Sequence, residues 1–149
     1  MAELPDKEIV RLFEGLRAKF PGLTMELHRD HPHVDVLMDI RAQDGLAFGV
    51  SVYLVGDELH LTAGHFWLEW FPCDRPAIRE AYREAVVGVL SGSYRILEHH
   101  VGGRAAKAQL QRPEANEWQT IGTWANLLTL VPWPRRKKVL QNVEVRGAE

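Results

Sequence analysis

The sequence has one cysteine, Cys73, among its 149 residues. A single cysteine excludes a disulfide within the chain and is typical of a reducing compartment. No apolar run approaches the roughly 18 residues that a membrane-spanning helix requires. The N-terminal stretch MAELPDKEIV carries acids where a signal peptide has a basic start. These absences predict a cytoplasmic protein with no membrane segment.

An excess of charge of either sign is also absent. The chain has 18 lysines and arginines against 20 aspartates and glutamates, and its net charge is −2. This balance gives no general attraction to nucleic acid or to an anionic membrane. The sequence contains none of the motifs CxxC, HExxH, GxSxG and GxxxxGK[ST]. We therefore assign no catalytic residue, no metal ligand and no cofactor from the sequence.

Two helices are predicted from apolar periodicity. In residues 6–20, apolar side chains recur at helical spacing and form one stripe, with Asp6 as the expected cap. The second helix covers residues 74–90, with Asp74 as its cap and Pro76 in its first turn. Each helix has one apolar face, so each is expected to pack on a sheet.

Residues 34–70 predict a β-meander of three strands. A three-residue turn at residues 43–45 pairs Ala42 with Leu46 and keeps apolar side chains on one face of the first two strands. A two-residue turn at Gly56-Asp57 leads into the third strand. Apolar parity changes within that strand, and a β-bulge at Gly64 would restore it.

The remaining apolar patterns complete an α+β fold. Five further strands are expected, over residues 23–28, 94–101, 105–112, 117–124 and 138–145. Residues 125–134 are ambiguous between a helical turn and a strand. We expect one domain over residues 1–149, a two-layer sandwich of one antiparallel sheet of six to seven strands with both helices on one face. The order is helix, four strands, helix, then two to four strands. It loosely resembles secretion-chaperone-like domains, without a matching motif and with extra strands.

The face of the meander opposite the helices is the predicted site. Asp35, Tyr53 and His60 are expected in one cross-strand row. There a carboxylate, a phenol and an imidazole could orient one another and adjust one another's pKa for proton transfer or ligand binding. The same face is predicted to carry His65, Trp67 and Glu69. A solvated sheet face lined with polar residues is the competing interpretation, and it is common among antiparallel sheets.

Trp67 stands among these polar residues. A tryptophan in that setting often marks a contact surface, because it combines a large apolar area with one polar atom. Alternatively, residues 127–133 could cover it. An exposed face with Tyr53, Val55 and Trp67 could also be a homodimer interface.

The histidines and the basic run suggest two other interpretations. His28, His31 and His33 lie close together in the sequence, yet they lack the paired spacing of a zinc site, and adjacent His99 and His100 should point to opposite faces of a strand. Residues 135–138 are all basic and near three tryptophans, which could suggest single-stranded nucleic acid. A solvated loop before an edge strand explains this small charge cluster more simply.

Two functions remain open. The first is a binding protein that uses the open sheet face to hold a protein partner or a second copy of itself, as a homodimer. The second is a small-molecule-binding domain or enzyme that uses the Asp35, Tyr53 and His60 neighbourhood. A flat face buried against a twofold mate favours the first, and a concave, partly apolar pocket favours the second.

Overall fold

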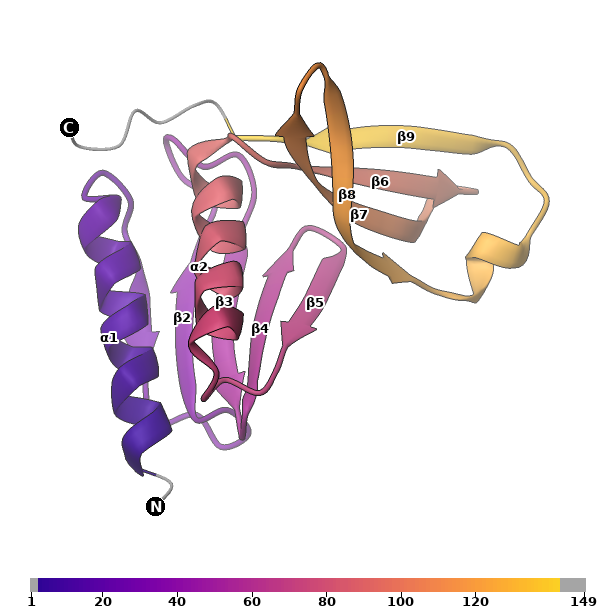
Figure 1. The fold of residues 1–149 in the computed structure, drawn as a ribbon. Coiled ribbons are helices and arrows are strands. Elements are labelled where there is room, and N and C mark those ends of the chain that lie inside the picture. The colour runs from indigo at the N-terminus through magenta and orange to yellow at the C-terminus, as the bar shows by residue number, and fades with distance from the viewer. Residues whose placement is uncertain (1–2, 143–149) are drawn as a thin grey trace.

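The structure is a computed structural model that describes residues 3–142. It is an α+β fold with two helices, α1 and α2, and two antiparallel sheets (Figure 1). The expected class is therefore confirmed, but the expected single sheet of six to seven strands is wrong. The elements in chain order are α1 Glu3–Lys19, β1 Glu26–His28, β2 Val36–Ile40, β3 Val50–Val55, β4 Glu58–Ala63, β5 Phe66–Trp70, α2 Pro76–Ser91, β6 Arg95–Val101, β7 Arg104–Glu114, β8 Glu117–Ala125, a 3-10 turn Leu127–Leu130 and β9 Arg135–Leu140.

The first sheet joins five strands in sequence order, from β1 to β5. Alternate residues of β2 and β3 are buried, as expected for strands with one covered face; in β4, His60 is buried as well as the residues on the covered face. Both helices lie against this sheet (Figure 1). Their apolar stripes enter one core with the buried strand residues and with Phe20, which directly follows α1; the helix residues are Ile9, Phe13, Leu16, Tyr82, Ala85, Val86, Val89 and Leu90.

The second sheet has the order β8-β7-β6-β9 and lies beyond β5 (Figure 1). It does not extend the first sheet by hydrogen bonds. The two sheets meet through packing of side chains instead. Leu68 of β5 lies so close to Gly122 of β8 that a Cβ placed on Gly122 would collide with it. Apolar patterning predicts that a segment is a strand, but it does not say which strand it will pair with, and this is why two sheets were expected as one.

The β2–β3 connection corrects the predicted register. Val36 pairs with Leu54 and Ile40 with Val50, two residues away from the predicted pairing. The chain turns more tightly, since Gln43 and Leu46 exchange both backbone hydrogen bonds around a two-residue turn. A shift of two residues leaves every side chain on its original face, so the division into core face and open face is correct.

Gly64 is part of a turn and not of a bulge. β4 ends at Ala63, the chain reverses at Gly64-His65, and β5 pairs antiparallel with β4, Ala63 opposite Phe66. Gly64 has φ 59°, as a glycine at the first central position of a tight hairpin turn can adopt at little cost. The reversal corrects the parity as a bulge would have done, so Trp67 and Glu69 still lie on the face of Tyr53 and His60.

Two helix and strand ends also differ from expectation. The cap position of α2 is Arg75, whose side chain makes no capping hydrogen bond, so the predicted Asp74 cap is wrong, whereas Pro76 opens the helix as expected. β9 begins at Arg135, so the basic residues 135–138 lie in a strand and not in a loop. Residues 143–145 of the predicted last strand lie outside the described residues. Within residues 3–142, neither helix is long and apolar enough to cross a membrane.

Candidate functional site

The open face of the first sheet brings four of the six predicted site residues together. Tyr53 pairs with His60 across β3 and β4, and His60 pairs with Glu69 across β4 and β5. Trp67 lies two pairs further along β5, opposite Thr62 and on the same face. Asp35 is not in this row, because Leu37 is opposite Tyr53 in the observed register.

The carboxylate of Asp35 has a different role. Its Oδ2 accepts a hydrogen bond of 2.8 Å from the backbone N–H of Gly56, at the β3–β4 turn. That bond closes the end of the β2–β3–β4 meander. Asp35 therefore holds a turn in place and is removed from the acid–base row that the sequence suggested.

His60 is enclosed between two aromatic rings. Its imidazole stacks on Tyr53 with a centroid separation of 4.7 Å, and it lies edge to edge and nearly coplanar with the indole of Trp67, whose centroid is 5.7 Å away. Only 5% of the residue is exposed, while Trp67 is 42% exposed. We call these three rings the Tyr53–His60–Trp67 stack; its outer member is the partly exposed indole.

Hydrogen bonds fix the tautomer of His60. The indole N–H of Trp67 can only donate, and it lies 2.8 Å from Nδ1 of His60, which must therefore be the unprotonated nitrogen. The proton is then on Nε2, 3.2 Å from Oε2 of Glu58. Both ring nitrogens are engaged, so His60 has no free nitrogen to offer a substrate as acid or base.

The Tyr53 hydroxyl is held in its neutral form. Burial raises the pKa of the Tyr53 phenol above its ordinary value, and the Glu69 carboxylate also raises it, while Trp67 acts in the opposite sense. The phenol is consequently a hydrogen-bond donor at neutral pH and not a base. This arrangement suits recognition better than proton abstraction.

A small hollow lies beside the stack, where the two sheets meet. It has a volume of about 220 Å³ and is lined by Trp67, Leu68, Glu69, Thr123, Trp124 and Ala125. The segment beside Trp67 is therefore β8 and not residues 127–133, which the sequence offered as its cover. Two indoles and a carboxylate around one hollow are groups that attract a cation.

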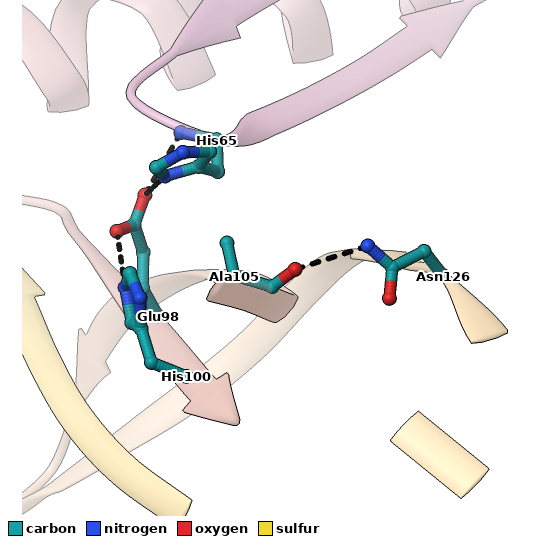
Figure 2. Close-up of polar contacts among 5 residues, drawn as sticks. All are labelled: His65, Glu98, His100, Ala105 and Asn126. Atoms are coloured by element: carbon teal, nitrogen blue, oxygen red, sulfur yellow. Dashed lines mark hydrogen bonds and ion pairs between the residues drawn. The ribbon is translucent and has the colours of Figure 1, made fainter. Parts of the chain in front are cut away.

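His65 belongs to a second cluster, between the two sheets (Figure 2). It lies in the β4–β5 turn and reaches Glu98 of β6, together with His100 of the same strand. Oε2 of Glu98 accepts from the backbone N–H of His65 at 2.8 Å and lies 3.1 Å from Nδ1 of its ring, while Oε1 lies 2.9 Å from Nε2 of His100. Glu98 is only 1% exposed.

The carboxylate of Glu98 is stabilised in its charged form. Burial by itself would raise its pKa, but the hydrogen bonds from the His65 backbone and from both imidazoles outweigh burial and lower the pKa. Sequence reasoning missed Glu98 and His100 as site residues. A signal was available, since Glu98 follows Ile96 on the buried parity of a predicted strand, where a carboxylate needs a partner.

The surroundings of this cluster are basic. His100 lines a hollow of about 540 Å³ with Gly102, Gly103, Pro134 and three basic residues of β9, Arg136, Lys137 and Lys138. Asn126, which follows β8, holds the start of β7: its side-chain amide donates a hydrogen bond of 3.0 Å to the carbonyl oxygen of Ala105 (Figure 2). Adjacent His99 contacts Gln109 instead of Glu98, so the two neighbouring histidines have separate partners.

The other predicted candidates lie apart from both clusters. His31 and His33 lie in an exposed loop, where Nδ1 of His31 accepts from the backbone N–H of His33 at 3.1 Å. Cys73 is buried, and burial raises the pKa of its thiol, with Asp57 and Asp74 acting in the same direction. A thiol held in its protonated form is a poor nucleophile, and it fits a structural role.

Comparison with known proteins adds no identification. Protein-family models, curated proteins and solved structures all gave no match. The function must therefore be argued from the geometry of the two clusters.

Proposed function

We propose that this protein is a binding domain that holds a basic segment of a partner protein against the open face of its first sheet. The observation that carries the proposal is the hollow beside the Tyr53–His60–Trp67 stack. Its lining of Trp67, Trp124 and Glu69 combines two aromatic rings with one negative charge. A lysine or arginine side chain of the partner is the group that such a lining favours, through cation–π attraction and ion pairing.

The charge of the open face supports the same class of partner. Acidic side chains lie across the face: Glu26, Asp35, Asp39, Glu58 and Glu69. Arg41 lies beside them, 3.8 Å from Asp39. Complementary charge steers association and selects among partners. An acidic face with an exposed indole therefore favours a basic partner over an acidic one.

The size of the hollow favours a protein side chain over a free metabolite. Small-molecule sites commonly have volumes of about 300–1,000 Å³, whereas this hollow has about 220 Å³. The engagement of both His60 nitrogens also weighs against an acid–base enzyme at this face. The alternative of a small-molecule-binding domain or enzyme at the Asp35, Tyr53 and His60 neighbourhood is consequently the weaker one.

A second copy of the chain is the first partner to test. The chain itself exposes the basic stretch Arg135–Leu140 in β9, which could be seated on the acidic face of a neighbour. Sedimentation velocity over a wide range of protein concentration measures this directly. A strict monomer at the highest concentration removes self-association and leaves a different basic partner.

The site itself is tested with short peptides. Acetylated Gly-Lys-Gly and Gly-Glu-Gly peptides are titrated while the indole N–H resonances of Trp67 and Trp124 are followed by NMR. We expect the lysine peptide to shift both resonances and the glutamate peptide to shift neither. Trp67→Ala and Glu69→Gln should weaken binding of the lysine peptide. Trp133→Ala should not, because Trp133 is an exposed tryptophan outside the hollow. Equal response to both peptides would remove the proposed site.

A further inference from the structure

The strongest feature outside the open face is the cluster of His65, Glu98 and His100 (Figure 2). We propose that these three residues form a binding site for a divalent metal ion of the zinc class. Each residue offers one donor atom, and the three donor atoms lie within 4.8 Å of one another. Two imidazole nitrogens and a carboxylate oxygen form a ligand set found in zinc enzymes.

The donor atoms are close enough to share one ion. Zinc binds nitrogen and oxygen ligands at about 2.0–2.2 Å, which places neighbouring donors of a tetrahedral site roughly 3.4 Å apart. Oε2 of Glu98 lies 3.1 Å from His65 Nδ1, and Oε1 lies 2.9 Å from His100 Nε2. Because each histidine contacts a different oxygen, the ion would sit against both oxygens of the carboxylate and take the place of the protons that now lie between these atoms.

The fold holds the central ligand in position. The backbone N–H of His65 donates 2.8 Å to Oε2 of Glu98, and such outer hydrogen bonds orient ligating carboxylates. A Cβ on Gly64 would come within 2.8 Å of Oε2, so glycine allows the turn to approach the carboxylate this closely. The ligands come from both sheets, and an ion here would fasten the β4–β5 turn to β6.

Charge gives an independent reason for a cation. Glu98 is 1% exposed, and its carboxylate contacts two imidazoles but forms no ion pair with a lysine or arginine of residues 3–142. Its hydrogen bonds already hold it in the charged form, which is the form that binds a metal ion. A divalent cation bound by neutral histidines would supply the full positive charge that this carboxylate lacks.

The surroundings also indicate the class of further ligand. Three protein donors leave a coordination position for water or another molecule, as in catalytic zinc sites. His65 is 57% exposed at its side chain, so the cluster is open to solvent. Arg136 and Lys138 line the hollow that His100 borders, and their charge favours an anionic ligand.

This site departs from the sequence-based expectation of no native metal site. That expectation rested on closely spaced motifs, and here 33 residues separate His65 from Glu98. The pair Glu98 and His100 is an ordinary i, i+2 arrangement on a strand face. Only the packing of the β4–β5 turn on β6 adds the third donor.

Titration of the untagged, chelator-treated protein with Zn²⁺ and Co²⁺ tests the proposal. Calorimetry should give about one zinc per chain, and cobalt should give visible d–d absorption typical of low coordination number. His65→Gln and His100→Gln should each weaken binding by at least the ten- to hundredfold that loss of an outer partner costs. His99→Gln and the double variant His31→Gln/His33→Gln are matched controls and should bind as the wild type does.

Three results would overturn the site. They are the lack of saturable binding of either metal, retention of wild-type affinity in His65→Gln, and loss of binding in the His31/His33 variant alone. His65→Gln changes an exposed side chain, so it is informative even if His100→Gln does not fold. Zinc should also raise the melting temperature of the wild type and not of His65→Gln, because binding to the native state stabilises it. Inorganic phosphate should change the cobalt spectrum; an unchanged spectrum removes the anionic ligand.

Discussion

Trp67 and His60 are joined by a hydrogen bond of 2.8 Å between the indole Nε1 and the imidazole Nδ1, and their rings are also nearly parallel. Trp67 therefore supplies both an aromatic ring beside the imidazole and the donor that fixes the tautomer of His60. These two contributions can be separated, because phenylalanine retains a ring but has no N–H group.

The first prediction concerns this donor. Trp67→Phe should leave Nδ1 of His60 buried without a partner and lower the free energy of unfolding by about 1–3 kcal/mol. Urea denaturation measures the loss. Trp133→Phe is the control, since Trp133 is 63% exposed and should change stability by less than about 0.5 kcal/mol. Long-range ¹H–¹⁵N spectra of the wild type should show His60 protonated at Nε2; a mixture of tautomers would contradict the assignment.

The second prediction concerns the turn at Gly64. Gly64→Ala and Gly56→Ala both place a side chain at a left-handed φ, 59° and 61°. That conformation should cost each variant about 1–2 kcal/mol. Only the Gly64 variant also brings its Cβ against Glu98 and Leu140, while nothing lies within 4 Å at Gly56. Thermal unfolding should therefore show a greater loss for Gly64→Ala, by about 1–3 kcal/mol. Equal losses would show that the approach of the turn to β6 is not tight.

The third prediction contrasts two helical glycines. Gly15 lies in α1, and a Cβ added there would have nothing within 4 Å, so Gly15→Ala should raise stability by up to about 1 kcal/mol through helix propensity. Gly88 lies in α2 directly against the ring of Tyr94. Gly88→Ala should lower stability, because the ring must move. Chemical denaturation gives both values, and the same sign for both would contradict the close contact of Gly88 with Tyr94.

The fourth prediction concerns pH. The native state lowers the pKa of Glu98, so the unfolded chain, with a glutamate pKa of about 4.3, binds this proton more readily. The resulting stabilisation is present above that value and is lost as the pH falls through the lower, native pKa. Glu98→Gln cannot titrate. The stability difference between wild type and Glu98→Gln should therefore be largest above about pH 5 and shrink in acid. A difference that stays constant between neutral and acidic pH would contradict the assignment.

The sequence determined most of the helices and strands of this protein and the faces of its first sheet; the predicted third strand of the meander is two strands, β4 and β5, in the structure. Alternation of apolar residues is a local property, and the turns at Gly45 and Gly56 have local signatures. The observed β2–β3 pairing is two residues away from the predicted one, yet the faces are the same, because side chains alternate with a period of two. Likewise, a hairpin at Gly64 replaced the expected bulge without moving Trp67 or Glu69 to the other face.

Tertiary structure alone decided how the strands divide into two sheets and which distant side chains meet. The last four strands form a sheet of their own. Backbone hydrogen bonds are the same for every residue type, so the sequence of a strand does not specify which strand it pairs with. The same packing took His65 away from the open face and brought it to Glu98 and His100. It also placed Trp124 beside Trp67. Contacts across 33 or more residues depend on how whole sheets pack, and no local pattern contains that information.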